Sequence, residues 1–404
     1  MKIAIATSDG GTVLRHFGRA PEFLVAEISS GGYEILEVRE NTPVCNGWDH
    51  EAERFDASID IIADCVSVVA AQIGDFAKNS LLRRGIASFE QRGTVESAIK
   101  KTASRLAEAA ALTEKPAENP KPEGTHPCFN DGAHGKYGRI HLPVSAVCNI
   151  KCRFCERDIN DDELRPGVSA GILSPEDAVS TVARALELCP DITVAGIAGP
   201  GDAMASPYAF ETFRRVGEAF PEMNLCLSTN GLGLAGRVAE LYDAGVRFIT
   251  VTVNAVRPEI GERIVSHVIW NGETLTGRNA AELLILRQLA GIREAAAAGL
   301  TVKINTVLIP GVNDAHIGEI AKTVSALGAA RHNIMALIPN AEFKDVAAPG
   351  CTELEAVRAE SELYMPQFRN CTHCRADACG VPGVSEFSRE LYAGVANFRC
   401  NNVC

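Results

Sequence analysis

Long apolar runs are missing from this sequence of 404 residues. No segment approaches the 18 or more consecutive apolar residues of a membrane span. The N-terminal MKIAIATSDGG lacks the apolar core and cleavage site of a secretory signal and reads as a first strand and turn. A basic excess is also absent, because 39 Lys and Arg stand against 51 Asp and Glu, for a net charge of −12. We therefore expect no membrane insertion, no secretion and no broad nucleic-acid surface.

Cysteine, by contrast, is frequent, with 14 in the chain. Without a secretion signal we expect a cytoplasmic protein, in whose reducing surroundings clustered thiols bind metal more often than they form disulfides. Neither G-x4-G-K-[ST] nor G-x-G-x2-G after a strand occurs, so no phosphate-cradling loop is predicted. The length gives room for two or three domains.

A Pro-rich, charged segment at residues 113–125 is predicted to be an extended linker between two domains. Before it, residues 1–112 contain short β-rich runs and a closing helix from Thr94 to Ala110, which predict a small α/β domain. After it come a larger domain, residues 126–380, and a cysteine-containing tail, residues 381–404. The β-rich runs of the first domain lie at 2–7, 22–28 and 33–40, and an apolar run at 65–74, a short helix and the segment 86–89 follow.

Six apolar runs alternate with helical segments in the larger domain. One helix has a full start signal, with Ser174 as N-cap, Pro175 at the first helical position and Asp177 close behind. Six strand–helix units predict a parallel sheet that curves into a partial (β/α)6 barrel, with a doubly wound sheet as the alternative. The runs are 139–144, 192–199, 225–231, 248–256, 302–311 and 333–340.

Cys148, Cys152 and Cys155 follow the first of these runs in a C-x3-C-x2-C pattern. Three thiolates on one loop can hold three irons of a cubane [4Fe–4S] cluster and leave the fourth iron without a cysteine. An open iron is typical of a reactive cluster rather than of an electron carrier. A zinc site and three structural thiols are the alternatives.

The other predicted strands also end in polar or glycine-rich residues, and the ends of barrel strands converge on one mouth. Any one of them, taken alone, is an ordinary turn. A cluster with an open iron at such a mouth suits S-adenosylmethionine (SAM), whose amine and carboxylate can chelate that iron. Glycines allow close backbone approach to a ligand, and carboxylate, hydroxyl and amide groups can bind its amine and hydroxyls. The candidate SAM-binding residues are Gly199, Gly201, Asp202, Ser228, Thr229, Asn230 and Asn254.

The cysteine motif in its barrel resembles the radical-SAM superfamily, and residues 126–380 resemble the NifB family of nitrogenase cofactor maturases. Residues 1–112 are similar to the NifX-like cofactor-binding domain, which normally follows the barrel in two-domain members and here precedes it. The stretches that carry the likeness include HPCFN (126–130), KYGRIHLPV (136–144), CNIKCRFC (148–155), ELRPGVS (163–169), GIAGPGD (196–202), KINTVLIPGVN (303–313), QFRNCTHCRADACG (367–380) and, in the first domain, HFGRAPEF (16–23).

The resemblance implies a SAM-binding [4Fe–4S] cluster on Cys148, Cys152 and Cys155, and two auxiliary [4Fe–4S] clusters as substrates. One SAM gives its methyl group to a cluster sulfide. Another is cleaved reductively to a 5′-deoxyadenosyl radical, which removes hydrogen from that methyl. The carbon becomes the central carbide of a fused eight-iron precursor of the nitrogenase cofactor. Iron–sulfur donor and cofactor-acceptor proteins are the implied partners, in nitrogen fixation.

The resemblance also implies ligands for the auxiliary clusters. His126 and Cys128 match the HPC motif of the family, and Cys371 and Cys374 match its C-terminal C-x2-C. Cys226 matches a family position as well, although its place at the start of an apolar strand favours buried packing.

One departure from the family lies between Cys155 and RPGV, where the family usually carries a further cysteine. Here the stretch 156–164 has none. Asp161, Asp162 or Glu163 could substitute, although a carboxylate is a harder and less usual iron–sulfur ligand than a thiolate. Glu163 falls where the family has a glutamate near the SAM cluster. Glu163 could close the resting cluster as its last ligand, or it could form an ordinary salt bridge with Arg165.

Cysteines outside the barrel are further candidates. Cys400 and Cys404 in the tail could fold back onto a cluster, with frayed terminal thiols as the alternative. In the first domain Cys45, His50 and Cys65 could hold a cluster or finished cofactor, although Cys65 heads an apolar run and is predicted to be core.

Two other functions stay open. One is a radical-SAM reaction on a peptide or small molecule, in which auxiliary clusters transfer electrons. The other is a non-catalytic iron–sulfur carrier, which would not cleave SAM.

Overall fold

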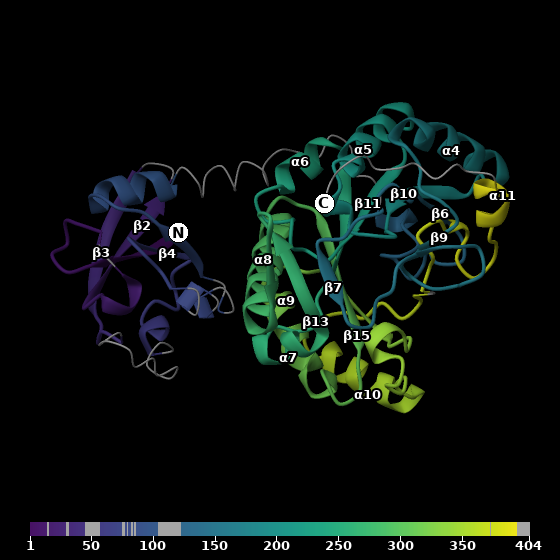
Figure 1. The fold of residues 1–404 in the computed structure, drawn as a ribbon. Helices are drawn as coiled ribbons and strands as arrows, with labels where there is room; N and C mark the ends of the chain where they lie inside the picture. Colours follow the sequence, from purple (N-terminus) through teal and green to yellow (C-terminus); the bar gives the residue numbers. More distant parts are fainter. Residues whose placement is uncertain are drawn as a thin grey trace. The chain divides into compact units, whose positions relative to one another are not determined.

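The chain divides into two compact units, Met1–Lys115 and Pro116–Cys404, shown in Figure 1 and described separately. The computed structural model describes residues 1–13, 16–29, 32–44, 57–74, 77–78, 80–81, 84, 86–103, 123–371 and 373–393. Across these residues no helix is both long and apolar enough to cross a membrane.

The first unit contains a five-stranded sheet in the order β3-β2-β1-β4-β5. In β1, Ile3 and Ile5 join one buried apolar cluster and Ala4 and Ala6 join another, as the two-residue period of a strand requires. The predicted strands are confirmed, and 95–103 is the described part of the predicted closing helix. The strands are β1 (Lys2–Thr7), β2 (Glu22–Ser29), β3 (Gly32–Glu40), β4 (Ser67–Ala70) and β5 (Ala87–Glu90).

The second unit is built on six parallel strands that neighbour one another in chain order. A doubly wound sheet would reverse its strand order partway across. The unbroken order therefore confirms the partial barrel. The strands are β6 (Gly138–His141), β10 (Ile192–Ile197), β11 (Asn224–Thr229), β12 (Val246–Thr252), β15 (Thr301–Leu308) and β16 (Arg331–Ala336), with the antiparallel β17 (Cys379–Gly380) on β6.

Helices connect these strands. The predicted start of α4 is confirmed, because Ser174 Oγ accepts a hydrogen bond from Asp177 N at 3.1 Å and Pro175 is the first helical residue. Ala178, Val182 and Ala185 then bury one face of α4 at helical spacing. The helices are α4 (Pro175–Leu188), α5 (Tyr208–Ala219), α6 (Val238–Asp243), α7 (Pro258–Ile264), α8 (Gly277–Ala297), α9 (Ile317–Ala326), α10 (Cys351–Glu362) and α11 (Ser388–Tyr392).

A small sheet holds the cysteine loop, and the sequence did not predict it. In this sheet β7 (Ile150–Cys152) pairs with β13 (Val265–Trp270), which pairs with β14 (Glu273–Thr276). Cys152 lies opposite Val265 in the ladder. A two-stranded pair, β8 (Asp158–Ile159) and β9 (Val168–Ser169), follows Cys155. The loop is therefore fixed by backbone pairing on either side of its last two cysteines.

Candidate active site

One cavity of about 350 Å³ is lined by alternate residues of the parallel strands. Side chains at i and i+2 of a strand point to the same face, so the first five strands each contribute two or three of them, and the sixth strand contributes its last two residues, Met335 and Ala336. A cavity of this size suits a ligand such as SAM. These strand residues are Arg139, His141, Val194, Gly196, Cys226, Ser228, Thr250, Thr252, Lys303, Asn305 and Val307.

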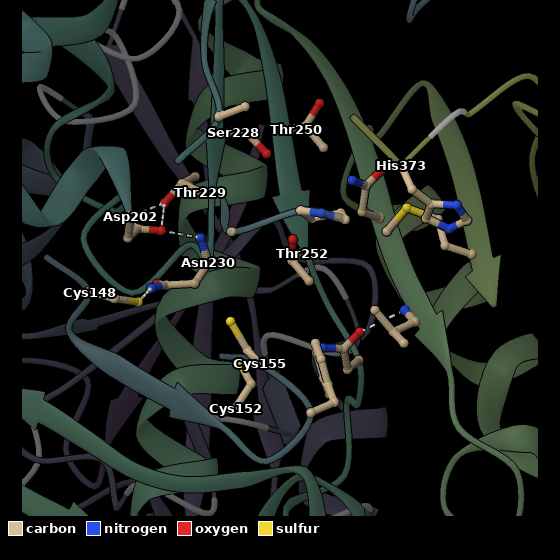
Figure 2. A pocket seen from close by; sticks show the side chains of 18 of the residues that line it. Cys148, Cys152, Cys155, Asp202, Ser228, Thr229, Asn230, Thr250, Thr252 and His373 are labelled. Atoms are coloured by element: carbon tan, nitrogen blue, oxygen red, sulfur yellow. Dashed lines mark hydrogen bonds between the residues drawn. The ribbon is translucent and has the colours of Figure 1, made fainter. Parts of the chain in front are cut away.

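Cys148, Cys152 and Cys155 line the same cavity, below the Asp202–Asn230 group in Figure 2. Burial raises the pKa of all three thiols, that of Cys148 to about 11. A bound metal reverses this effect, since it favours the thiolate. No three His, Cys, Asp or Glu side chains of the described residues lie close enough to share one metal ion, as zinc requires. In a cubane cluster each thiolate binds an iron of its own, so three thiolates of one loop need not meet at a single ion.

Asp202 organises the polar groups beside the cysteines. Its carboxylate accepts hydrogen bonds from Thr229 Oγ1 at 3.0 and 3.1 Å and from Asn230 N at 2.5 Å. The Asn230 side chain donates to Asn149 Oδ1 at 2.7 Å and lies 3.7 Å from Cys148 Sγ (Figure 2). Asp202 thus holds the strand end that contacts the cysteine loop, and burial raises the pKa of its carboxyl.

Ser228 and Asn254 also line the cavity. The Asn254 carbonyl oxygen Oδ1 accepts a hydrogen bond from Val307 N at 2.9 Å, which fixes the side chain and leaves its N–H groups as the donors for a ligand. Gln288 of α8 fixes the neighbouring strand ends, because its Nε2 donates to the carbonyls of Asn230 and Thr252 at 2.7 and 2.8 Å.

The two glycines of the second strand end also have a structural reason of their own. A Cβ at Gly201 would lie 1.9 Å from Val147 O, so this glycine makes room for the cysteine loop itself. Gly199 has φ of +140° and packs against Ala376; it is not among the residues that line the cavity, whereas Gly201 is. Close approach here is between two backbone segments, since Gly201 N donates to Ser145 O at 2.6 Å.

Gly201→Ala is expected to displace the cysteine loop, because the new methyl group meets backbone that has no flexible end to move. After reconstitution with iron and sulfide, the variant should lose about four irons per chain, the content of one cubane. Gly124→Ala is the matched control, since a Cβ there meets nothing within 4 Å. Equal iron contents in the two variants would contradict this role for Gly201.

The other expected ligands lie in the wall of the same cavity. His126, Cys128, Cys371 and Cys374 line it, as does Cys226. Burial raises the pKa of Cys128 to about 11 and that of Cys226 to about 12. Cys226 therefore lies in the cavity wall, rather than in the packed layer behind the sheet that its apolar strand suggested.

Two histidines of this wall differ in which ring nitrogen carries the proton and which keeps a lone pair for a metal. Cys128 N donates to His126 Nδ1 at 3.1 Å, so the neutral His126 ring carries its proton on Nε2, a donor that has no partner among the described residues. His141 Nδ1 lies 3.0 Å from Arg375 O, which can only accept, so its Nε2 keeps the lone pair. Burial lowers the pKa of His141 to about 4, which keeps the ring neutral. The tautomers thus favour His141 over the expected His126 as a nitrogen ligand.

Sequence reasoning missed His141, Arg139 and Lys303. Arg139 Nη2 lies 3.4 Å from Cys374 Sγ, and Lys303 Nζ donates to Cys128 O at 3.0 Å. All three stand in quoted apolar runs at inward strand positions. Their signal was a polar residue at every second place in a run that is otherwise buried.

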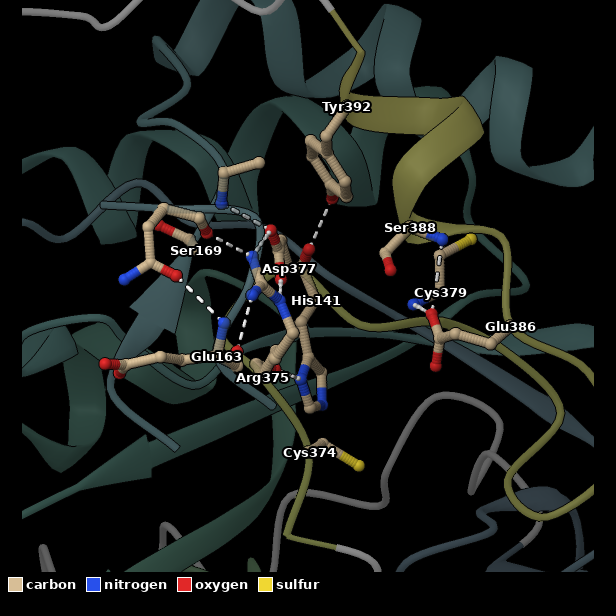
Figure 3. Close-up of polar contacts among 12 residues, drawn as sticks. His141, Glu163, Ser169, Cys374, Arg375, Asp377, Cys379, Glu386, Ser388 and Tyr392 are labelled. Carbon is tan, nitrogen blue, oxygen red and sulfur yellow. Dashed lines mark hydrogen bonds and ion pairs between the residues drawn. The ribbon is translucent and has the colours of Figure 1, made fainter. Parts of the chain in front are cut away.

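Glu163 forms an ion pair with Arg165 at 2.5 Å, the second of the two alternatives that the sequence left open. Neither Glu163 nor its exposed neighbours Asp161 and Asp162 is among the residues that line the cavity. Figure 3 shows how the backbone of this loop is held: Arg375 donates to Glu163 O at 2.6 Å and to Asn160 O at 2.8 Å. The loop that lacks the family cysteine is therefore tied to the segment that carries Cys374.

The remaining candidates come from the tail and the first domain. Cys400, Cys404, Cys45 and His50 lie outside the described residues. Cys65 is part of the buried core of the first unit, as its apolar run predicts, and burial raises its pKa to about 11.

Comparisons with known proteins match both units. The dinitrogenase iron-molybdenum cofactor family matches residues 1–105, and the radical SAM superfamily matches residues 142–324. The FeMo cofactor biosynthesis protein NifB of Methanocaldococcus infernus is 46% identical over 269 residues, which are 66% of this chain and 89% of that protein. The protein of the same name from Klebsiella pneumoniae is 42% identical over 289 residues, 70% of this chain and 61% of that protein.

Among solved structures, SuiB of Streptococcus suis bound to S-adenosylmethionine superposes with a TM-score of 0.43 at 11% identity. The match covers 91% of this chain and 73% of that one. So distant a likeness carries no conclusion about the reaction.

Proposed function

Because the chain belongs to the NifB family and is a radical-SAM enzyme, we propose that it makes the iron–sulfur–carbide precursor of the nitrogenase cofactor. Two [4Fe–4S] clusters would be its substrates, and SAM would supply the carbon. The relatives' shared name, FeMo cofactor biosynthesis protein, supports this assignment. The first unit, matched by a cofactor family, would hold a cluster or the finished product.

The observation that carries the proposal is that two sets of side chains suited to iron–sulfur ligation line one cavity. Cys148, Cys152 and Cys155 form the first set. The second set comprises Cys128, Cys226, Cys371, Cys374 and, from its tautomer, His141. A carrier needs no SAM-type site beside its cargo. An enzyme that transfers carbon from SAM to a cluster needs both in one enclosed space.

The first set fits a resident [4Fe–4S] cluster, which when bound supplies the electron that cleaves SAM. Around it, Ser228 and the Asn254 side-chain N–H groups would bind the polar groups of SAM. Asp202 accepts hydrogen bonds from Thr229 and Asn230, and so holds the strand end next to Ser228 beside Cys148. Apolar side chains of Ile264, Leu284 and Ile285 also line the cavity and exclude water from the reacting carbon.

The second set would hold the substrate clusters. One SAM would methylate a sulfide of such a cluster and leave as S-adenosylhomocysteine. One-electron reduction of a second SAM would break its sulfur–C5′ bond and release methionine, and the 5′-deoxyadenosyl radical so formed would take a hydrogen atom from that methyl and leave as 5′-deoxyadenosine. Proteins that deliver the clusters and accept the product are the partners that this reaction requires.

The test is product analysis on the reconstituted full chain, reduced with dithionite and supplied with SAM. Both S-adenosylhomocysteine and 5′-deoxyadenosine are expected, together with about twelve irons per chain for three cubanes. 5′-Deoxyadenosine alone would indicate a radical reaction on another substrate. If neither product forms, a non-catalytic iron–sulfur carrier is the function that remains. A stable chain with four irons would contradict the proposal.

A further inference from the structure

Lys303 is a buried cation without a carboxylate partner in the part of the chain that the structure describes. Only 5% of the residue is exposed, and its Nζ donates to Cys128 O at 3.0 Å. The ammonium also lies 4.7 Å from the Phe129 ring centre and 5.1 Å from that of Phe368. A carbonyl and two rings orient the charge but do not neutralise it. Burying a charge without a counter-ion is unfavourable, so the position calls for an anion.

The position of Lys303 points to where that anion would lie. In β15, Lys303, Asn305 and Val307 occupy alternate places and all line the cavity. The backbone atom that Lys303 contacts belongs to Cys128, a residue of the second ligand set.

A second cation faces the same set from another strand. Arg139 of β6 is 3% exposed, and its Nη2 lies 3.4 Å from Cys374 Sγ. Its Nη1 donates to Gly380 O at 2.8 Å, and its Nη2 lies 3.2 Å from the half-exposed carboxylate of Glu386. Arg139 is therefore partly compensated, whereas Lys303 is not.

We propose that the auxiliary iron–sulfur cluster is the counter-ion of Lys303, and that Lys303, with Arg139 as a second cation, binds this substrate by charge. The inference rests on the proposed function, because it needs an auxiliary cluster. A cubane held by thiolates carries net negative charge, so a buried site for it requires cations nearby. The same cation favours the cluster state with one more electron and so raises the reduction potential of the cluster.

A purely structural lysine would behave differently. Lys303→Met keeps an unbranched apolar stem against Phe129 and Phe368 and removes only the charged head. If Lys303 serves the fold, the metal-free variant should melt at a lower temperature. If Lys303 serves the cluster, the metal-free variant should melt no lower than the parent, because an uncompensated charge has been removed. The substitution should then weaken only the cluster-loaded protein, through faster loss of iron.

The experiment uses the full chain with Cys148, Cys152 and Cys155 replaced by Ala, so that the auxiliary site alone is observed. Into this parent we would introduce Lys303→Met, the charge-keeping Lys303→Arg, and Lys322→Met, which alters an exposed lysine of α9. Each chain is reconstituted with iron and sulfide. The measurements are iron content, the rate of iron release to a chelator, the cluster potential by EPR-monitored titration, and the melting temperature without metal.

Lys303→Met is expected to release iron at least about tenfold faster, within the range for lost support of a metal site. Its cluster potential should become more negative, and its metal-free melting temperature should not fall. Lys303→Arg should keep a potential near that of the parent, and Lys322→Met should match the parent throughout.

Three results would overturn parts of this picture separately. A lower metal-free melting temperature in Lys303→Met, with release rate and potential unchanged, would overturn the inference and leave the proposed function standing. A parent that retains no iron would overturn both. If cluster release depends on Lys303 but the unaltered chain forms no S-adenosylhomocysteine, the inference holds and the proposed function fails.

Discussion

Cys152→Ala is expected to reduce the formation of both SAM-derived products to background. Cys152 ends β7, lines the cavity, and lies opposite Val265 in the ladder that fixes the loop. Alanine preserves this pairing and removes only the thiol. With two thiolates left, the resident cluster loses a ligand, and the electron that cleaves SAM is no longer delivered. S-adenosylhomocysteine and 5′-deoxyadenosine are quantified by chromatography after reduction in the presence of SAM.

The control for this substitution is Cys351→Ala, which removes an exposed thiol at the start of α10, away from the cavity. It should leave both products at the parental level. The Cys152 variant should still keep about eight irons, those of the two auxiliary cubanes. Product formation that survives in Cys152→Ala would exclude the three cysteines as the site of SAM cleavage.

Arg375→Met is expected to destabilise the barrel unit strongly. The guanidinium forms a two-pronged ion pair with Asp377 at 2.8 and 2.9 Å, and it also donates to the carbonyls of Asn160 and Glu163 (Figure 3). Asp377 is 1% exposed, so the substitution leaves a buried, unpaired carboxylate. Removing one partner of such a pair lowers the free energy of unfolding by about 3–5 kcal/mol.

Arg369→Met is the matched control, because Arg369 pairs with Glu355 and Glu362 at the surface of the same segment. Such exposed pairs contribute about 0–1 kcal/mol. Both variants are compared by urea unfolding of the metal-free chain. Hydrogen exchange should also show lost protection at Asn160 N, which donates to Ser169 O, in the Arg375 variant only. Equal urea midpoints for the two variants would contradict a stabilising role for the buried Arg375–Asp377 ion pair.

Local patterns explain why much of the fold was predictable. Apolar runs bounded by turn residues located the six parallel strands, and the cap at Ser174 located the start of α4. Each of these features is decided within a few residues of itself. The unbroken strand order of the barrel then follows from six successive strand–helix units.

The cysteine motif and the polar strand ends were found by the same local reading, but the contacts that decide their roles were not. Arg375 contacts Asn160, which lies 215 residues earlier in the sequence, and Gly201 leaves room for the Val147 backbone. Such pairings depend on which segments the fold brings together, and no short-range pattern encodes them. Lys303 was missed as a cavity residue, and Cys226 was expected to be packed, because their strands are buried on both faces, which hides the alternation of an inward and an outward side.

The pairing of β17 with β6 has a consequence for the order of events during synthesis. Cys148, Cys152 and Cys155 leave the ribosome within a single short stretch, soon followed by Asp202, Asn230 and Asn254. Cys371 and Cys374 emerge much later, and β17, just beyond them, joins this segment to β6 near the beginning of the unit. Chains emerge and fold from the N-terminus onward. The three clustered thiols are thus translated together, while the part of the cavity wall that carries Cys371 and Cys374 is completed only after the last strand has been made.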